Sequence, residues 1–221
     1  WFWESGGNRP IDPAYYFAAA DVPDGAELHG LIAFLYGCFS AGTPCYDEYA
    51  LSRHARARAG GAANVEAPAR EQIADRSFVA RLPQRMLGHP NGGALAVVGH
   101  IDLGVASTFL WGTGDARPTF PHRQAFESVF ARLFAGHPIG SAFDYFGERY
   151  AETAVLLNGA LDELRWATGT NEQRERAAWD VAYLWAAQTD ARNFVVLGDP
   201  AVRLCAAEPA PAAWSDRDRP V

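Results

Sequence analysis

Lysine is absent from this chain of 221 residues, so its 19 basic residues are all arginines, and 26 acidic residues outnumber them. The resulting net charge of -7 argues against the clustered cations that a phosphate-binding surface needs, and we expect no nucleic-acid partner. A phosphate-binding loop that ends in lysine is excluded, and no Gly-x-Ser-x-Gly turn is present. NTPase and serine hydrolase activities are therefore disfavoured.

Cysteine is scarce as well. Cys38, Cys45 and Cys205 are an odd number of residues, and none of them forms a Cys-x-x-Cys pair, so we expect no disulfide framework. No set of His, Cys and acidic residues has the spacing of a metal site. The sequence therefore predicts neither a metal nor a cofactor.

Long apolar runs are also missing. No stretch reaches the about 18 to 20 apolar residues that cross a bilayer, so we expect no membrane partner. Reduced cysteines and an arginine- and alanine-rich composition, typical of GC-rich bacterial genes, predict a cytoplasmic bacterial protein. The chain begins at Trp1 rather than at Met and has no charged-then-apolar leader, so we expect a further segment or domain of the same protein upstream.

The composition suits one folded domain, because 49% of the residues are hydrophobic and seven are Trp. Residues 1–30 are rich in Gly, Pro and Asp and predict an extended arm with at most one short strand. Residues 31–205 form the predicted core. Residues 206–221 are rich in Ala and Pro and predict a linker tail.

The core alternates apolar strand-like runs with helical periodicity. The runs without polar alternation predict buried strands, at residues 31–37, 94–99 and 193–197. Apolar residues at helical spacing predict helices at residues 45–54, 78–87, 123–135, 139–166 and 172–191. Residues 57–69 and 101–121 read as loops. This order predicts an α/β fold, namely a three-layer α/β/α sandwich around a mostly parallel sheet.

Cys38 is the strongest candidate for a functional residue. It follows the first predicted strand and precedes the small-residue turn FSAGTP and a predicted helix. Such a position lies at the carboxyl edge of a sheet, where α/β proteins bind ligands, and a helix N-terminus there would favour a thiolate. A buried, inert cysteine is the alternative interpretation.

Three segments in this order resemble the gingipain-type and CHAT branch of the caspase-like cysteine peptidases: LIAFLYGCFSAGTP, FVARLPQRMLGHPNGGALAVVGHID and NFVVLGDPAVRL. The resemblance implies a caspase-like fold and hydrolysis of peptide or protein substrates through a Cys-His dyad. It makes Cys38 the nucleophile, with an oxyanion hole that includes the Cys38 backbone N–H. Gly37 and Asp102 are the candidate substrate-binding residues.

The catalytic histidine is harder to identify. The His29-Gly30 pair precedes Cys38, but the intervening strand would hold it roughly 25 to 30 Å away. His100, at the end of the second predicted strand, is the one histidine that a parallel pairing would bring near Cys38, as a substitute base, a pocket wall or a locally hydrogen-bonded residue. Asp102 could accept a hydrogen bond from His100 or bind a basic substrate side chain, or it could be a simple loop carboxylate.

Two functions remain open from the sequence. The first is a cysteine endopeptidase whose dyad histidine lies upstream of this chain. The alternative is a catalytically incomplete caspase-like scaffold that binds peptides or partner proteins. Cys45 is expected to be structural, and Asp199 in the Gly-Asp-Pro segment is expected to form a turn.

Overall fold

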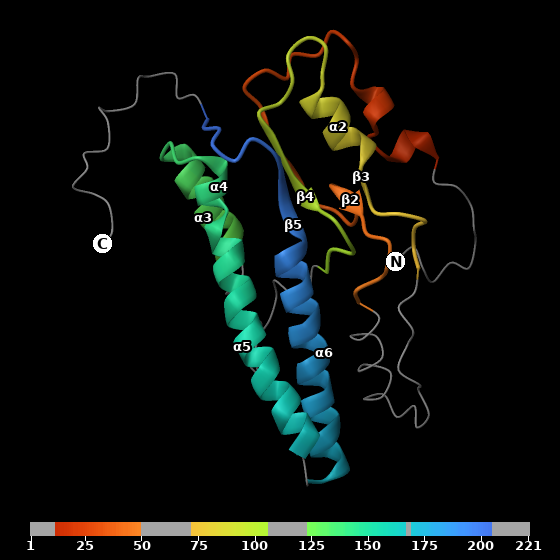
Figure 1. The fold of residues 1–221 in the computed structure, drawn as a ribbon, viewed down its shortest axis with the longest axis vertical. Coiled ribbons are helices and arrows are strands. Elements are labelled where there is room, and N and C mark those ends of the chain that lie inside the picture. The colour runs from red at the N-terminus through yellow and green to blue at the C-terminus, as the bar shows by residue number, and fades with distance from the viewer. Residues whose placement is uncertain (1–11, 50–71, 106–122, 167–168, 205–221) are drawn as a thin grey trace, which may run out of the picture.

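The computed structural model of the protein describes residues 12–49, 72–105, 123–166 and 169–204 (Figure 1). A three-stranded sheet lies at its centre, with strand order β1-β4-β5. Its strands are β1 (Ile32–Leu35), β4 (Ala96–His100) and β5 (Phe194–Gly198). Strand β4 runs parallel to β1 and antiparallel to β5, so the sheet is mixed.

Strand β4 is the middle of the sheet, and all five of its residues are buried. Its uninterrupted apolar run suits a strand that is covered on both faces. The parallel register pairs Leu35 with Gly99, so the chain leaves β1 at the same edge at which β4 ends. The candidate residues Cys38 and His100 lie at this edge.

Helices cover the two faces unequally. One face packs against α3 (Arg123–Phe134), α4 (Ile139–Ala142) and α5 (Asp144–Trp166), through a core that includes Val98 and Phe146. The other face packs Ala33 and Val97 against Met86 of the short helix α2 (Arg81–Leu87). Most of the core therefore lies on the α3–α5 side.

Helices α5 and α6 (Asn171–Asn193) form a long hairpin that extends well beyond the sheet (Figure 1). Thr170 begins α6 with a capping box, in which its hydroxyl accepts from the Gln173 amide and the Gln173 side chain accepts from the Thr170 amide. The end of α6 continues directly into β5. None of the helices in the described ranges has the length and apolar character needed to cross a bilayer.

The segment before β1 packs against α2 instead of extending away as an arm. Residues 12–30 contain two 3-10 turns, η1 (Pro13–Tyr15) and η2 (Ala19–Asp21), and no strand. Arg85 of α2 donates to the carbonyl oxygen of Val22 at 2.9 Å and pairs with Asp24. Residues 1–11 of the predicted arm and the whole predicted tail, 206–221, lie outside the described residues.

The α/β class predicted from the sequence is confirmed, but the predicted architecture is not clearly present. The described sheet is small, and its third strand is antiparallel rather than parallel. The reason is that β5 follows α6 without a crossover, so the chain returns along β4 from the opposite end. Among the described helices only α2 covers the second face, so the fold is not a clear three-layer sandwich.

One predicted helix is wrong where it can be checked. Residues 45–49 are not helical, and the turn after Cys38 leads into the short strand β2 (Gly42–Thr43). This strand pairs antiparallel with β3 (Phe78–Val79), which also removes Phe78 from the predicted helix 78–87. The rest of the helix expected at 45–54 lies outside the described residues, as does the loop 57–69.

The other predicted helices and strands are confirmed with small shifts in their bounds, whereas residues 106–121 of the predicted loop 101–121 lie outside the described residues. The predicted helices 123–135 and 172–191 correspond to α3 and α6. The predicted helix 139–166 is divided at Phe143 into α4 and α5. Asp199 forms the expected turn, because its carboxylate accepts from the Ala201 amide at 2.8 Å.

We expect Gly147→Ala to raise the free energy of unfolding by about 0.5–1 kcal/mol, because alanine is the better helix former. Gly147 lies in α5, and a Cβ atom placed there would meet no atom within 4 Å. Urea denaturation measures the change.

Gly42→Ala is the contrasting control, since its added Cβ would lie 2.5 Å from the Phe78 carbonyl oxygen. It should destabilise the protein. A loss of stability in Gly147→Ala would contradict the open environment of α5 at this position.

Candidate functional site

Cys38 lies just beyond the carboxyl end of β1, with its side chain exposed. Its Sγ atom is 3.6 Å from the carbonyl oxygen of Gly104, in the loop that follows β4. The next residue, Phe39, has a φ of 56°, in the left-handed region that non-glycine residues rarely adopt. The thiol is therefore held on a sharp turn at the edge of the sheet.

Hydrogen bonds tie this turn to β4. The Ser40 hydroxyl donates to the Leu35 carbonyl oxygen at 2.7 Å and accepts from the His100 amide at 2.9 Å. The Ala41 amide donates to the His100 carbonyl oxygen at 2.9 Å, and the Phe39 amide donates to the Asp102 carbonyl oxygen at 2.8 Å. The position of Cys38 consequently depends on the backbone of residues 100–102.

Glycine is required where the turn crosses the strand. A Cβ atom on Gly99 would lie 3.0 Å from both the Ala41 Cβ and the Ser40 Oγ. A larger residue at 99 would push the turn away from β4. The sequence motif GGALAVVGH thus contains one glycine that the Cys38 turn needs.

His100 is fully buried, with 0% of its surface exposed. Its Nδ1 lies 2.8 Å from the Asp102 carbonyl oxygen and 3.2 Å from the Asp102 amide nitrogen. Its Nε2 lies 3.3 Å from Oδ1 of Asp190, and its ring packs edge-on against Phe194. A carbonyl oxygen can only accept, so the 2.8 Å contact is a hydrogen bond that Nδ1–H donates to Asp102. Both ring nitrogens therefore face protein groups.

Asp190 is the residue that the sequence interpretation missed. It lies in α6, is also 0% exposed, and contacts His100 through Oδ1. The same oxygen accepts from the Val105 amide at 3.0 Å, and Oδ2 lies 3.8 Å from NH1 of Arg149 in α5. The Asp190 carboxylate therefore joins the α5–α6 hairpin to the end of β4 and to the loop after β4, which both lie beside Cys38.

Burial changes the ionisation of the groups around Asp190. Desolvation lowers the pKa of Arg149, and the nearby Asp190 carboxylate opposes this shift. Desolvation also raises the pKa of Tyr183 to about 12 and raises that of Tyr49, and Asp190 adds to both shifts. These tyrosines are therefore neutral at physiological pH.

The two predicted substrate-binding residues differ in their placement. Gly37 directly precedes Cys38, just beyond the carboxyl end of β1. Asp102 is only 1% exposed, and its Oδ1 accepts from the Leu103 amide at 2.7 Å. Its contact with His100 is made by the backbone, not by the carboxylate that the sequence suggested. Asp102 thus behaves as a buried loop carboxylate.

The other candidate residues lie elsewhere. His29 packs beside Gly92 near the amino end of β1, as its distance along the strand predicted. The Sγ atom of Cys45 lies 3.2 Å from the Ala74 carbonyl oxygen, which agrees with a structural role. No helix begins within residues 38–49, so the predicted dipole stabilisation of a Cys38 thiolate is wrong. Cys205 lies outside the described residues.

No group of three or more His, Cys, Asp or Glu side chains in the described part of the chain could hold a metal ion. No family model, curated protein or solved structure matches the chain. Only the residues of the site itself therefore indicate its chemistry.

Removal of the Asp190 carboxylate should destabilise the protein strongly. We expect Asp190→Ala to lower the free energy of unfolding by about 3–5 kcal/mol, because it leaves Arg149 and His100 buried without their anion. Chemical denaturation measures this loss.

Glu175→Ala is the matched control, since Glu175 is an exposed carboxylate on the same helix. It should change the free energy of unfolding by less than about 0.5 kcal/mol. Equal effects of the two substitutions would contradict the role given to Asp190.

Tyr49 is 4% exposed, and no described group hydrogen-bonds to its hydroxyl. We expect Tyr49→Phe to raise the free energy of unfolding by about 1 kcal/mol at neutral pH, because an unsatisfied buried hydroxyl is removed. The phenol also has a raised pKa in the folded state, so the unfolded chain ionises first and stability falls as pH rises above about 10.

Tyr49→Phe should therefore lose less stability than the wild type between about pH 9 and pH 11 in thermal unfolding. The control is Tyr46→Phe, which alters an exposed ring. An alkaline stability profile that is unchanged in Tyr49→Phe would argue against this assignment.

Proposed function

We propose that this chain carries the nucleophile of a caspase-like cysteine endopeptidase, with Cys38 attacking the peptide carbonyl. The observation that supports this most directly is an exposed thiol on a strained turn at the carboxyl edge of the sheet. The order of three sequence segments that resemble the gingipain-type and CHAT peptidases supports the same function.

The backbone around Cys38 suits an oxyanion hole. Within the described residues, the Cys38 amide makes no hydrogen bond. A Cβ atom on Gly104 would lie 3.8 Å from the Cys38 nitrogen, so the absence of a side chain at Gly104 leaves room beside this amide. In the proposed reaction the Cys38 N–H donates to the oxygen of the tetrahedral intermediate.

His100 is not the base in this proposal. A general base must come within hydrogen-bonding distance of the thiol, directly or through one water. Both ring nitrogens of His100 face other protein groups, and the ring has no exposed surface. The proposed base is an imidazole outside the described residues, and His100 is assigned to holding the Cys38 turn in place.

The chemistry then follows the general course for a cysteine nucleophile. The base removes the thiol proton as sulfur attacks the peptide carbonyl, and the protonated base gives that proton to the departing amine. Water, activated by the same base, hydrolyses the thioester and releases the acid product. The layered caspase-like fold belongs to this proposal and is supported by helices on both faces of β4.

The burial of His100 also favours the second candidate function, a caspase-like scaffold that has lost its dyad. In that case Cys38 would remain accessible to alkylating reagents but would not turn over substrate. Activity of the protein separates the two functions.

Peptide hydrolysis by the protein expressed from its complete gene provides the test, with a fluorogenic peptide library as substrate. We expect Cys38→Ala to lower kcat/KM by at least about a thousandfold, because the nucleophile is removed. Cys45→Ala is the matched control and should retain wild-type activity.

A peptidyl acyloxymethyl ketone should also form an adduct at Cys38 that is detectable by mass spectrometry. Equal turnover by wild type and Cys38→Ala would remove Cys38 from the mechanism. An adduct at Cys38 without any turnover would support the scaffold instead.

A further inference from the structure

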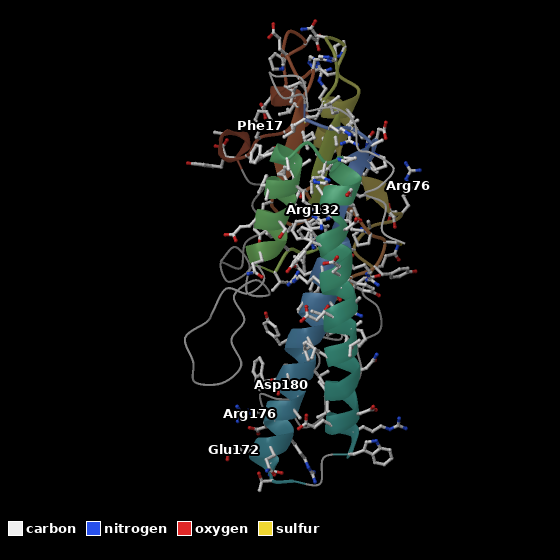
Figure 2. The ribbon with its side chains drawn as sticks, turned by 90° about the vertical axis from the view of Figure 1, so that its left-hand side faces the viewer. Phe17, Arg76, Arg132, Glu172, Arg176 and Asp180 are labelled. Carbon is white, nitrogen blue, oxygen red and sulfur yellow. The ribbon has the colours of Figure 1, made fainter. Side chains whose placement is uncertain are left out.

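The distal halves of α5 and α6 project away from the sheet, as seen from two directions (Figures 1 and 2). They are held together by a buried seam that includes Leu157, Val181 and Leu184. Other apolar side chains of the hairpin lie outside this seam and are exposed, among them Val155 and Leu156.

A cavity of about 340 Å³ opens between the two helices on one side of this seam. Small residues on both helices create the hollow, which is lined by Val155, Leu156, Gly159, Ala160, Glu163, Ala177, Asp180 and Leu184. Val155 is 72% exposed and Leu156 is 48% exposed. These two neighbours place an exposed apolar pair beside the open hollow.

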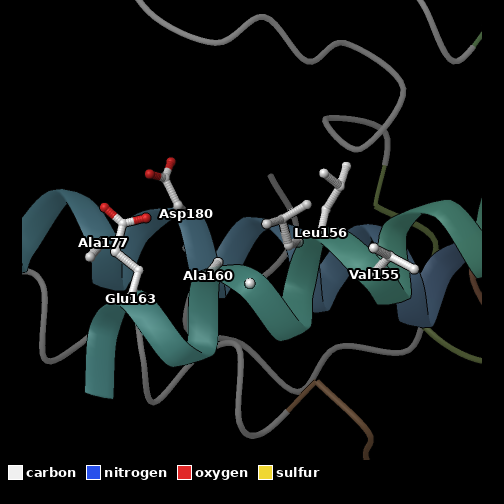
Figure 3. Close-up of a pocket in the computed structure, with 8 residues that line it drawn as sticks. Val155, Leu156, Ala160, Glu163, Ala177 and Asp180 are labelled. Atoms are coloured by element: carbon white, nitrogen blue, oxygen red, sulfur yellow. The ribbon is translucent and has the colours of Figure 1, made fainter. Parts of the chain in front are cut away.

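The cavity has an apolar end and an acidic end. Figure 3 shows Val155 and Leu156 at one end, and Glu163 and Asp180 at the other, with Ala160 between them. Glu163 belongs to α5 and Asp180 belongs to α6. Two carboxylates from opposite helices therefore lie at the same end of the hollow.

The electrostatics of this acidic end favour a cation. Burial raises the pKa of Asp180, Arg176 opposes this shift, and the nearby Glu163 adds to it by less than Arg176 removes. Arg176 lies one turn before Asp180 along α6 (Figure 2) and is not among the residues that line the cavity. A positive charge placed between Glu163 and Asp180 would be stabilised by both.

We propose that this hollow between α5 and α6, lined by Val155, Leu156, Ala160, Glu163 and Asp180, binds an amphipathic helix of a partner protein. An apolar side chain of that helix fills the space above Gly159 and Ala160, and an Arg or Lys pairs with Glu163 and Asp180. Ala160 and Glu163 lie three residues apart in α5, so the partner's apolar and basic residues are spaced by three or four positions. This is helix-in-groove recognition.

A second copy of this chain fits the hollow less well. A symmetric contact places the same surface on both copies, so two hollows facing each other would bring four carboxylates together. The net charge of -7 adds a further repulsion. Charge complementarity therefore favours a basic partner.

The test uses the whole chain and a synthetic, fluorescently labelled amphipathic peptide of about four helical turns, with Leu and Arg at the stated spacing. Fluorescence anisotropy should detect binding that weakens as salt is raised from about 50 mM to about 500 mM. Backbone amide NMR should show the largest shift changes around Gly159. A control peptide with Glu in place of each Arg should not bind.

Two variants and one control locate the binding. The double variant Glu163→Gln with Asp180→Asn should weaken binding at least about tenfold, because the charge pairs are lost. Gly159→Trp should abolish binding by filling the hollow, and an added Cβ there meets no atom within 4 Å, so the helix should still fold. The control, Glu148→Gln with Glu175→Gln, removes one exposed carboxylate from each helix outside the cavity and should bind normally.

Failure of the basic peptide to bind would overturn the proposal, as would equal binding by wild type and by Glu163→Gln with Asp180→Asn. Sedimentation analysis distinguishes a partner helix from a second copy of the chain as the occupant of the hollow. A dimer of the wild-type chain that Gly159→Trp disrupts would assign the hollow to a second copy and would also overturn the proposal.

Discussion

The contact between the Asp190 carboxylate and the His100 imidazole is the interaction on which the rest of the site depends. Both side chains are fully buried, and their closest atoms are 3.3 Å apart. A charge this deep in a protein is stable only when other groups compensate it. Arg149 and the Val105 amide supply this compensation from two further segments. The cluster thereby fixes α5, α6, β4 and the loop after β4 relative to one another.

Cys38 itself makes few contacts, and its position follows from this cluster. On one side, His100 holds Ser40 and Ala41 through its backbone. On the other side, Asp190 holds Val105, next to the Gly104 carbonyl that lies beside the thiol. Under the proposed function, His100 is therefore a positioning residue rather than the base. Helix α6 contributes Asp190 to this cluster near its C-terminal end. Nearer its N-terminal end, the same helix lines part of the acidic hollow.

Local patterns in the sequence were enough for the part of the site that lies on β1 and β4. Two uninterrupted apolar runs predicted two buried strands of a mostly parallel sheet, and their parallel pairing in the structure places the ends of both strands at one edge. The direction of β5 could not be predicted in the same way, because a short apolar run does not show whether its strand is parallel or antiparallel to the neighbouring strand. Strand β2 lies in the segment predicted as a turn, and it was missed because its pairing partner, β3, lies far along the chain. Asp190 gave no local signal, because it lies 85 residues after Val105 within a helix that has many other charges.

Hydrogen exchange in an Asp190→Asn variant tests the central claim most directly. The amides of Phe39 and Ala41 donate to Asp102 and His100, so their protection reports on how firmly the Cys38 turn is held. The account predicts that Asp190→Asn accelerates exchange at these two amides by at least about tenfold more than at the amides of the buried strand β4. Glu175→Gln should leave all of them unchanged. Unaltered protection of Phe39 and Ala41 in Asp190→Asn would contradict the claim that the Asp190–His100 contact holds Cys38 in place.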